Sequence, residues 1–406
     1  MLKQVMGTYL PSAFSISLNT LPQNFNKRDA TFVHEYIHFI QDLLLPYCIR
    51  QNLVFINNFY WVSINVQNKK RLEIPFVEWS DDSKLTFQQT NYTWGNGPGN
   101  IHSGKIIDVQ SDYFTSVHNH NIYRYVLKFE DGTYYQFGAR DFLEYLAHKI
   151  ENQFWETSAP DLPYRTVDRI FDYYSINFVP EAVRLLIVEY CLYNDHPVRF
   201  FINAFINQAV ILNNKDKFYD YDTCKHFLLN LGWEAKGGFN ESILTKTERR
   251  LNDFRERLSE LYPHRQFESI QKWIITTNDF CRMELSNRFV ISSFYNMEKE
   301  DLFSFIDRLL DAIGIPVIIF NDSTISSKLL PRHYDSDQFL EFYVIKKFME
   351  WIGSNNNCCP IYDICSKNFG FAETVCKISP ISFQGECKFK VFLKSYCLDN
   401  IIIVRN

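Results

Sequence analysis

A helical pattern around the stretch HEYIHFIQD, residues 34–42, constrains the fold more than any other feature of the chain. Apolar residues recur there at helical spacing, at Phe32, Val33, Tyr36, Ile37, Ile40, Leu43 and Leu44. Asp29 is a suitable N-cap, and Pro46 is expected to end or kink the helix. The pattern therefore predicts an amphipathic helix between these two residues.

The predicted helix carries two histidines and a glutamate in an order that suits metal chemistry. His34 and His38 are four residues apart, so both lie on one helical face. Two imidazoles placed in this way can bind one Zn²⁺, and Glu35 can then take a proton from a metal-bound water. We expect His34 and His38 to be metal ligands and Glu35 to be the general base. The alternative is a core helix whose histidines only form hydrogen bonds.

A catalytic zinc usually has a third protein ligand, and two helical glutamates are candidates. No histidine follows His38 six residues later, so the extended metzincin motif is absent. Glu144 opens EYLAHKIE, in which Glu144, His148 and Glu151 share one helical stripe. Glu181 follows a proline and would lie in the first turn of a helix. We favour Glu144 as the third ligand, with Glu181 as the alternative.

Two further residues are candidates for supporting roles. His148 lies one turn after Glu144 and is a candidate for stabilising the transition state or for contacting a ligand. Asp42 lies one turn after His38 and is a candidate for orienting that imidazole. The alternative for both is an ordinary surface or packing role.

HEYIHFIQ followed by a glutamate helix resembles the HExxH zinc metallopeptidases called gluzincins, a branch of the zincins. The stretch EYLAHKIE is similar to their glutamate helix, although Tyr145 and Leu146 differ from the residues common there. The resemblance implies that zinc is held by His34, His38 and Glu144. It also implies a peptide substrate bound as an extra strand against a β edge. In typical gluzincins the third ligand follows the first helix more closely than it does here.

The rest of the sequence predicts an α+β fold with a zincin-like catalytic core. Residues 7–20 read as one or two strands, and residues 52–137 as a β-rich insertion whose clearest hairpin turns at Asp131-Gly132. A polar stretch near Lys236 suggests a boundary. We therefore expect a zincin-like metallopeptidase domain at 1–235. We expect a mostly helical, cysteine-containing region at 236–406 that shapes the cleft or binds a regulatory protein partner.

Composition narrows the function further. The formal charge of -5 gives no reason to expect a nucleic-acid partner, and no apolar run is long enough to span a membrane. No secretory signal is evident, so a cytoplasmic location with reduced thiols is expected. Six of the ten cysteines lie in the last fifty residues. They contain no CxxC pair, which favours buried thiols over a second metal site.

These patterns together predict a zinc-dependent peptidase, a hydrolase that cleaves a protein or peptide substrate with a metal-activated water. One alternative is a non-catalytic interaction protein that retains a zincin-like fold. Glu35 argues against it, because a scaffold does not need a glutamate beside the first histidine. A hydrolase of a non-peptide amide is a second alternative.

Overall fold

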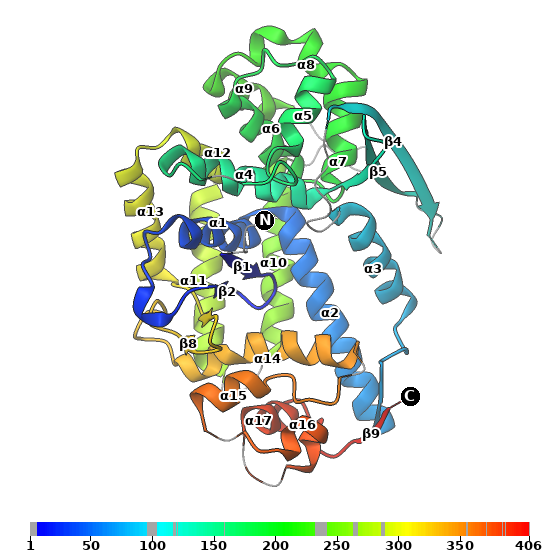
Figure 1. The fold of residues 1–406 in the computed structure, drawn as a ribbon, viewed down its shortest axis with the longest axis vertical. Coiled ribbons are helices and arrows are strands. Elements are labelled where there is room, and N and C mark those ends of the chain that lie inside the picture. Colours follow the sequence, from blue (N-terminus) through cyan, green and yellow to red (C-terminus); the bar gives the residue numbers. More distant parts are fainter. Residues whose placement is uncertain are drawn as a thin grey trace.

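The structure is a computed structural model, and the protein it describes is a mixed α and β protein in which helices predominate (Figure 1). The description covers residues 6–405 except 96–103, 117–118, 120, 158, 232–241, 263–266, 286–288, 355, 371, 384 and 386. The predicted boundary near Lys236 lies outside the described residues. No helix among the described residues has the length and apolar character needed to cross a membrane.

Three helices position the candidate site: α1 (Ala30–Leu44), α2 (Pro46–Lys69) and α4 (Ala139–Phe154). The predicted helix is α1, which begins directly after Asp29 and is buried over most of its length. Pro46 ends it as expected, and the same proline opens α2, where its missing N–H costs no hydrogen bond. α4 packs against α1. Asp141 caps its start by accepting a hydrogen bond from the Gly138 N–H at 2.9 Å.

A four-stranded sheet lies beside α1 and joins both halves of the chain. Its strands, in spatial order, are β1 (Gly7–Leu10), β2 (Ser15–Leu18), β7 (Val317–Phe320) and β8 (Ile325–Ser326). β1 is antiparallel to β2, and β2 is parallel to β7. The strands predicted in residues 7–20 are confirmed. Because β2 pairs with β7, the predicted division between residues 235 and 236 cuts through one sheet, and a single hydrophobic core continues across it.

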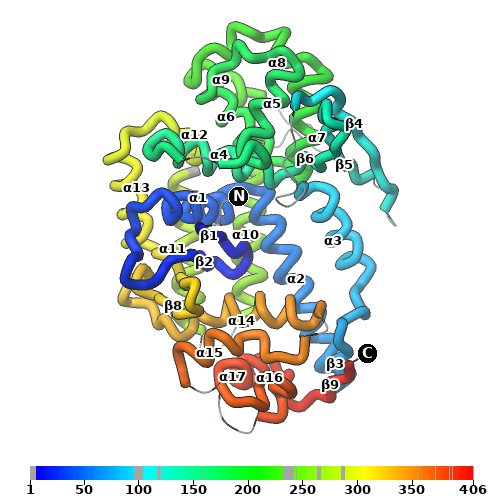
Figure 2. The backbone as a smooth tube through the Cα atoms, viewed as in Figure 1, coloured from blue at the N-terminus to red at the C-terminus, as the bar shows by residue number. Residues whose placement is uncertain are grey.

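The predicted hairpin is also confirmed. A second sheet contains β4 (Ile106–Thr115), β5 (Asn121–Phe129) and β6 (Tyr134–Phe137) in antiparallel order. Gly132 lies in the β5–β6 turn with φ of +80°, a conformation that glycine adopts without strain. In Figure 2 this sheet lies at one side of the molecule near α3 (Asp81–Trp94).

The prediction that the whole of residues 52–137 is β-rich is wrong. Residues 52–69 belong to the long helix α2, and α3 follows the short strand β3 (Arg71–Ile74), which pairs with β9 (Ile402–Arg405). The buried residues of α2 recur every three or four positions, at Leu53, Ile56, Phe59, Val62 and Val66. That spacing is helical, and the many aromatic and β-branched residues in the segment obscured it.

The remaining helices surround this core. Those before residue 232 are α5 (Thr166–Tyr173), α6 (Glu181–Leu192), α7 (Pro197–Phe200), the π-helical η2 (Phe201–Asn207), α8 (Val210–Asn213) and α9 (Tyr221–Asn230). Those after residue 241 are α10 (Ile243–Leu261), α11 (Glu268–Leu285), α12 (Val290–Ser293), α13 (Lys299–Ala312), α14 (Ser336–Ile352), α15 (Tyr362–Asn368), α16 (Val375–Ile378) and α17 (Lys388–Ser395). The described part of the C-terminal region is thus mostly helical, as predicted. Short 3-10 turns are η1 (Pro22–Asn24), η3 (Lys215–Lys217), η5 (Phe294–Asn296) and η6 (Pro380–Ser382).

Candidate metal centre

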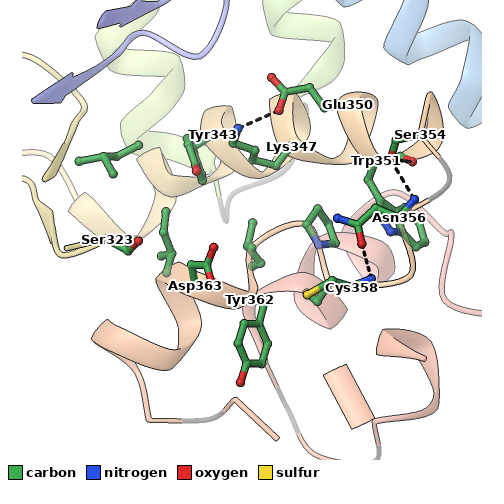
Figure 3. A pocket seen from close by; sticks show the side chains of 15 residues that line it. Ser323, Tyr343, Lys347, Glu350, Trp351, Ser354, Asn356, Cys358, Tyr362 and Asp363 are labelled. Carbon is green, nitrogen blue, oxygen red and sulfur yellow. Dashed lines mark hydrogen bonds and ion pairs between the residues drawn. The ribbon is translucent and has the colours of Figure 1, made fainter. Parts of the chain in front are cut away.

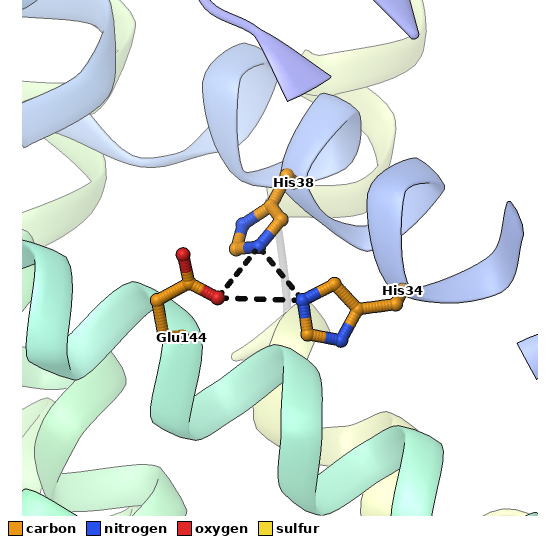
Figure 4. Close-up of side chains that lie close together, drawn as sticks. All are labelled: His34, His38 and Glu144. Atoms are coloured by element: carbon orange, nitrogen blue, oxygen red, sulfur yellow. Dashed lines mark hydrogen bonds and ion pairs between the residues drawn. The ribbon is translucent and has the colours of Figure 1, made fainter. Parts of the chain in front are cut away.

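His34 and His38 of α1 and Glu144 of α4 point their side chains at one another (Figure 4). The Nε2 atoms of the two histidines are 3.2 Å apart. Glu144 Oε2 lies 3.3 Å from His34 Nε2 and 3.4 Å from His38 Nε2. The helical spacing places the histidines on one face of α1, and the packing of α4 on α1 brings the glutamate to them.

This triangle has the dimensions of a zinc site. A tetrahedral zinc with bonds of about 2.0–2.1 Å has ligand atoms roughly 3.3 Å apart. The three atoms match that spacing, and two imidazole nitrogens with one carboxylate oxygen are ligands that zinc commonly binds. The side chains are 10–16% exposed, so the centre is largely shielded from solvent. Three protein ligands leave the fourth tetrahedral position for water or substrate.

Neighbouring groups hold both imidazoles in the orientation that metal binding requires. His34 Nδ1–H donates to Glu151 Oε2 at 2.9 Å. His38 Nδ1–H donates to Gln41 Oε1 at 2.7 Å, and Gln41 is itself anchored by donating to the Leu143 carbonyl at 3.1 Å. With a metal bound, Nδ1 of each ring would keep its proton for this partner and Nε2 would supply the lone pair that binds the metal. Glu144 has a partner as well, since its Oε1 lies 3.6 Å from Arg140 Nε.

Glu35 is close enough to interact electrostatically with both histidines and Glu144, and it faces strand β1. Burial raises the pKa of Glu35, while the two histidines and the Tyr9 backbone N–H oppose the rise. Gly7 of β1 leaves the space that the Glu35 side chain fills. A carboxyl group with a raised pKa next to the candidate ligands is suited to accept and return a proton.

The carboxylates give the centre a negative character. Burial works against ionisation of Glu144, but His38 and His34 hold its pKa well below the usual range. For Glu151, burial is likewise outweighed by His148 and His34, and the pKa falls to about 2. Burial lowers the pKa of His34, yet Glu144 and Glu151 raise it well above its ordinary value. The two carboxylates stay ionised and His34 tends to take up a proton, so the surroundings favour positive charge between these side chains.

The structure places the other predicted residues differently. His148 lies on the site side of α4, with Nδ1 3.6 Å from Glu151 Oε2, the carboxylate that also accepts from His34. Asp42 does not orient His38, because Gln41 fills that place. The Asp42 carboxylate instead accepts hydrogen bonds from the Tyr9 hydroxyl at 2.7 Å and from Asn52 Nδ2 at 2.9 Å, which ties β1 and α2 to α1.

Glu181, the alternative third ligand, is engaged elsewhere. Its carboxylate forms an ion pair with Lys149 and accepts a hydrogen bond from the Tyr295 hydroxyl at 2.9 Å. Lys149 also pairs with Asp168 at 2.9 Å. Glu181 therefore belongs to a network that joins α4, α5, α6 and η5, and Glu144 is the glutamate that meets the histidines.

Tyr164 lies beside the histidines of the metal centre. The sequence contains 24 tyrosines and gave no reason to select this one. Its ring contacts those of His34 and His148 with centroid distances of 6.1 and 5.1 Å. Burial and the charges of Glu144, Glu35 and Glu151 raise the pKa of Tyr164, so its hydroxyl keeps its proton. Tyr164 lies in the connection between α4 and α5, and only the fold brings it to the histidines.

Comparison with protein-family models, with curated proteins and with solved structures gave no match. The function is therefore inferred from the geometry and chemistry of this chain's own residues.

Proposed function

We propose that this protein is a zinc-dependent peptidase of the zincin type that cleaves a protein or peptide substrate. The observation that carries the proposal is the convergence of His34, His38 and Glu144 with zinc-like spacing beside the buried carboxyl group of Glu35. Orienting partners for all three ligands add support, because a chance cluster does not require them.

In the proposed reaction, His34, His38 and Glu144 would hold a zinc ion, which would lower the pKa of water and polarise the scissile carbonyl. Glu35 takes a proton from the attacking water and later gives it to the leaving amine. Tyr164 keeps its proton and its ring contacts that of His34, so its hydroxyl is the candidate donor of a hydrogen bond to the developing oxyanion. Glu151 and Gln41 keep the two imidazoles in the binding orientation throughout.

The position of β1 as an edge strand, within the part of the chain that the structure describes, supports a peptide substrate. The Asn19 N–H donates to the Met6 carbonyl at 2.8 Å, so in this antiparallel ladder the backbone groups of Gly7 and Tyr9 point away from β2. These are the residues beside Glu35. The Tyr9 N–H already interacts with the Glu35 carboxylate, so an extended peptide would pair through the remaining outward groups of this edge and run past the general base. An arrangement of this kind recognises the main chain of a peptide rather than one particular side chain.

The test measures zinc content and peptide cleavage in the full chain. We expect His34→Ala and Glu144→Ala each to lose one equivalent of zinc per chain relative to wild type, and the matched control Glu181→Ala to lose none. Glu35→Gln should keep the zinc and lose cleavage of a peptide library. Retention of all zinc in His34→Ala would overturn the metal centre. Zinc binding that depends on His34, with no cleavage of any protein or peptide, would favour a non-peptide substrate or a non-catalytic role.

A further inference from the structure

Strand β1 contacts helix α1 at two points, one at the proposed general base and one two helical turns away (Figure 1). Gly7 and Tyr9 are two positions apart in β1, so both face the same side of the strand. Gly7 lies against the Glu35 side chain, and the Tyr9 hydroxyl donates to Asp42 Oδ2 at 2.7 Å. Glu35 and Asp42 are seven positions apart, so they share one face of α1. The strand is therefore attached to α1 at both carboxylates.

Asp42 is the centre of a buried set of hydrogen bonds that we call the Asp42 clamp, made of Tyr9, Ser12, Asp42 and Asn52. Asp42 Oδ2 accepts from the Tyr9 hydroxyl and, at 3.3 Å, from the Ser12 N–H. Asp42 Oδ1 accepts from Asn52 Nδ2 at 2.9 Å, and Asn52 Oδ1 accepts from the Ser12 hydroxyl at 2.6 Å. The clamp thus joins the end of β1 and the turn after it to α1 and α2.

The burial of this carboxylate indicates a role beyond packing. Asp42 is 3% exposed and Asn52 is fully buried. Burial raises the pKa of Asp42 to about 6, and the hydrogen bonds from Tyr9, Asn52 and Ser12 oppose the rise. A buried charge is a poor source of stability, since apolar residues of similar volume often serve as well. A buried polar network whose members are satisfied instead fixes one arrangement of the elements that it joins.

We propose that Asp42, acting through Tyr9, is a positioning residue for the reaction of the proposed peptidase. The inference rests on the proposed function. Tyr9 joins the two carboxylates, because its hydroxyl donates to Asp42 and its backbone N–H interacts with Glu35. The β1 backbone is in close contact with the base, since a Cβ atom built at Gly7 would lie 2.9 Å from Glu35 Oε1. Holding the Tyr9 hydroxyl therefore fixes both the orientation of Glu35 and the edge that a peptide would pair with.

The clamp is separate from the groups that orient the proposed zinc ligands. Those groups are Glu151, Gln41 and Arg140, and none of them belongs to the clamp. Loosening β1 should therefore leave zinc in place. It should slow proton transfer by Glu35, and it should weaken the binding of any substrate long enough to pair with the strand.

The experiment compares Tyr9→Phe with wild type and with a matched control, Tyr343→Phe, in the full chain with zinc. Tyr343 is 8% exposed, much like Tyr9 at 7%, and it lies on α14 at a surface pocket of about 410 Å³ (Figure 3). Each variant loses one tyrosine hydroxyl and keeps the ring. We measure kcat and KM on an extended peptide and on a blocked dipeptide that is too short to pair along β1, together with zinc content and Tm.

In Tyr9→Phe we expect kcat to fall by about tenfold on both substrates, the effect of losing one hydrogen bond. KM should rise for the extended peptide alone, and zinc content should stay at the wild-type level. A merely structural role would lower the active fraction without this difference in KM between the two substrates. Kinetic constants equal to those of Tyr343→Phe would overturn the positioning role and leave the proposed peptidase intact. If wild type cleaves neither substrate, nor any other peptide, the proposed function fails and the positioning role fails with it.

A second variant, Asp42→Asn, covers the case in which Tyr9→Phe does not fold. Asparagine keeps the size of the side chain, but its amide nitrogen must face either the Ser12 N–H or Asn52 Nδ2, and both are donors. The clamp is therefore broken whichever way the amide points. The same rise in KM for the extended peptide, with zinc retained, supports the proposal. Wild-type constants in folded Asp42→Asn would overturn it.

Discussion

Gly7 and Glu35 are in such close contact that no larger residue fits at position 7 without displacing the glutamate. A Cβ atom built at Gly7 would lie 2.8 Å from Glu35 Cγ, 2.9 Å from Glu35 Oε1 and 2.8 Å from Thr31 Cγ2. Carbon atoms in favourable contact are about 3.5–4.0 Å apart. The glycine is therefore required for space rather than for an unusual backbone angle, and it lets an edge strand lie directly against the proposed general base.

Replacing Gly7 with alanine is expected to reduce peptide cleavage while leaving zinc bound. The added methyl group pushes the Glu35 carboxylate, and a misplacement of about 1 Å in a catalytic group can cost on the order of 100-fold in rate. The atoms nearest to the added methyl group belong to Glu35 and Thr31, and none belongs to the three proposed zinc ligands. Rates and zinc content of Gly7→Ala are compared with those of Thr8→Ala, whose side chain is exposed. Full activity in Gly7→Ala would contradict the proposed role of this contact.

Removing the charge of Glu151 should weaken zinc binding. The carboxylate accepts the His34 Nδ1 proton at 2.9 Å, and loss of such a partner typically lowers metal affinity by about 10–100-fold. We expect an affinity loss of that size in Glu151→Gln, measured by competition with a chelator of known zinc affinity. The exposed Glu156, changed to glutamine, is the control on the same segment. Equal affinity in both variants would mean that Glu151 does not support the ligand.

Tyr164→Phe should slow the chemical step more than it weakens substrate binding. The ring and its contacts with His34 and His148 are retained, whereas the donor to the oxyanion is lost. Loss of one such donor commonly lowers kcat by about 100–1,000-fold. The expected signature is a lower kcat with nearly unchanged KM and zinc content, compared with Tyr219→Phe at an exposed position. A rise in KM alone would assign Tyr164 to substrate binding.

The parts of the site that were predictable are those encoded by local spacing. His34, Glu35 and His38 lie in one helical turn, so their relation follows from the sequence. Gln41 is equally local, three residues after His38, but helical spacing allows contact at three or four residues and does not by itself decide between Gln41 and Asp42. Tyr164 depends on how the connection after α4 folds back, and no local pattern encodes that contact.

The fold shows the same division between local and long-range information. The β5–β6 hairpin was predictable because its Asp131-Gly132 turn lies within the segment. The helix α2 was not predictable from its own residues. Its aromatic and β-branched residues favour strands locally, while burial against the core stabilises a helix. The pairing of β2 with β7 joins residues some three hundred positions apart and left no signal in either segment.

Glu341 gives a prediction about stability that is independent of the metal centre. Its Oε1 has no hydrogen-bond partner in the described part of the chain, and burial raises its pKa from 4.5 to about 8, with Lys388 opposing the rise. Between pH 4.5 and 8 the folded protein keeps a proton that the unfolded chain has released. The folded state then binds more protons, so its stability falls as pH rises through this window.

Glu341→Gln should remove that loss of stability, because glutamine stays neutral at every pH. We expect the variant and wild type to be similar near pH 5 and the variant to be more stable near pH 8, by up to a few kcal/mol as an order of magnitude. Thermal unfolding at the two pH values measures this, with Glu256→Gln as the exposed control. A stability difference that is the same at both pH values would show that Glu341 does not titrate with folding, because only a proton held by the folded state makes the difference grow with pH.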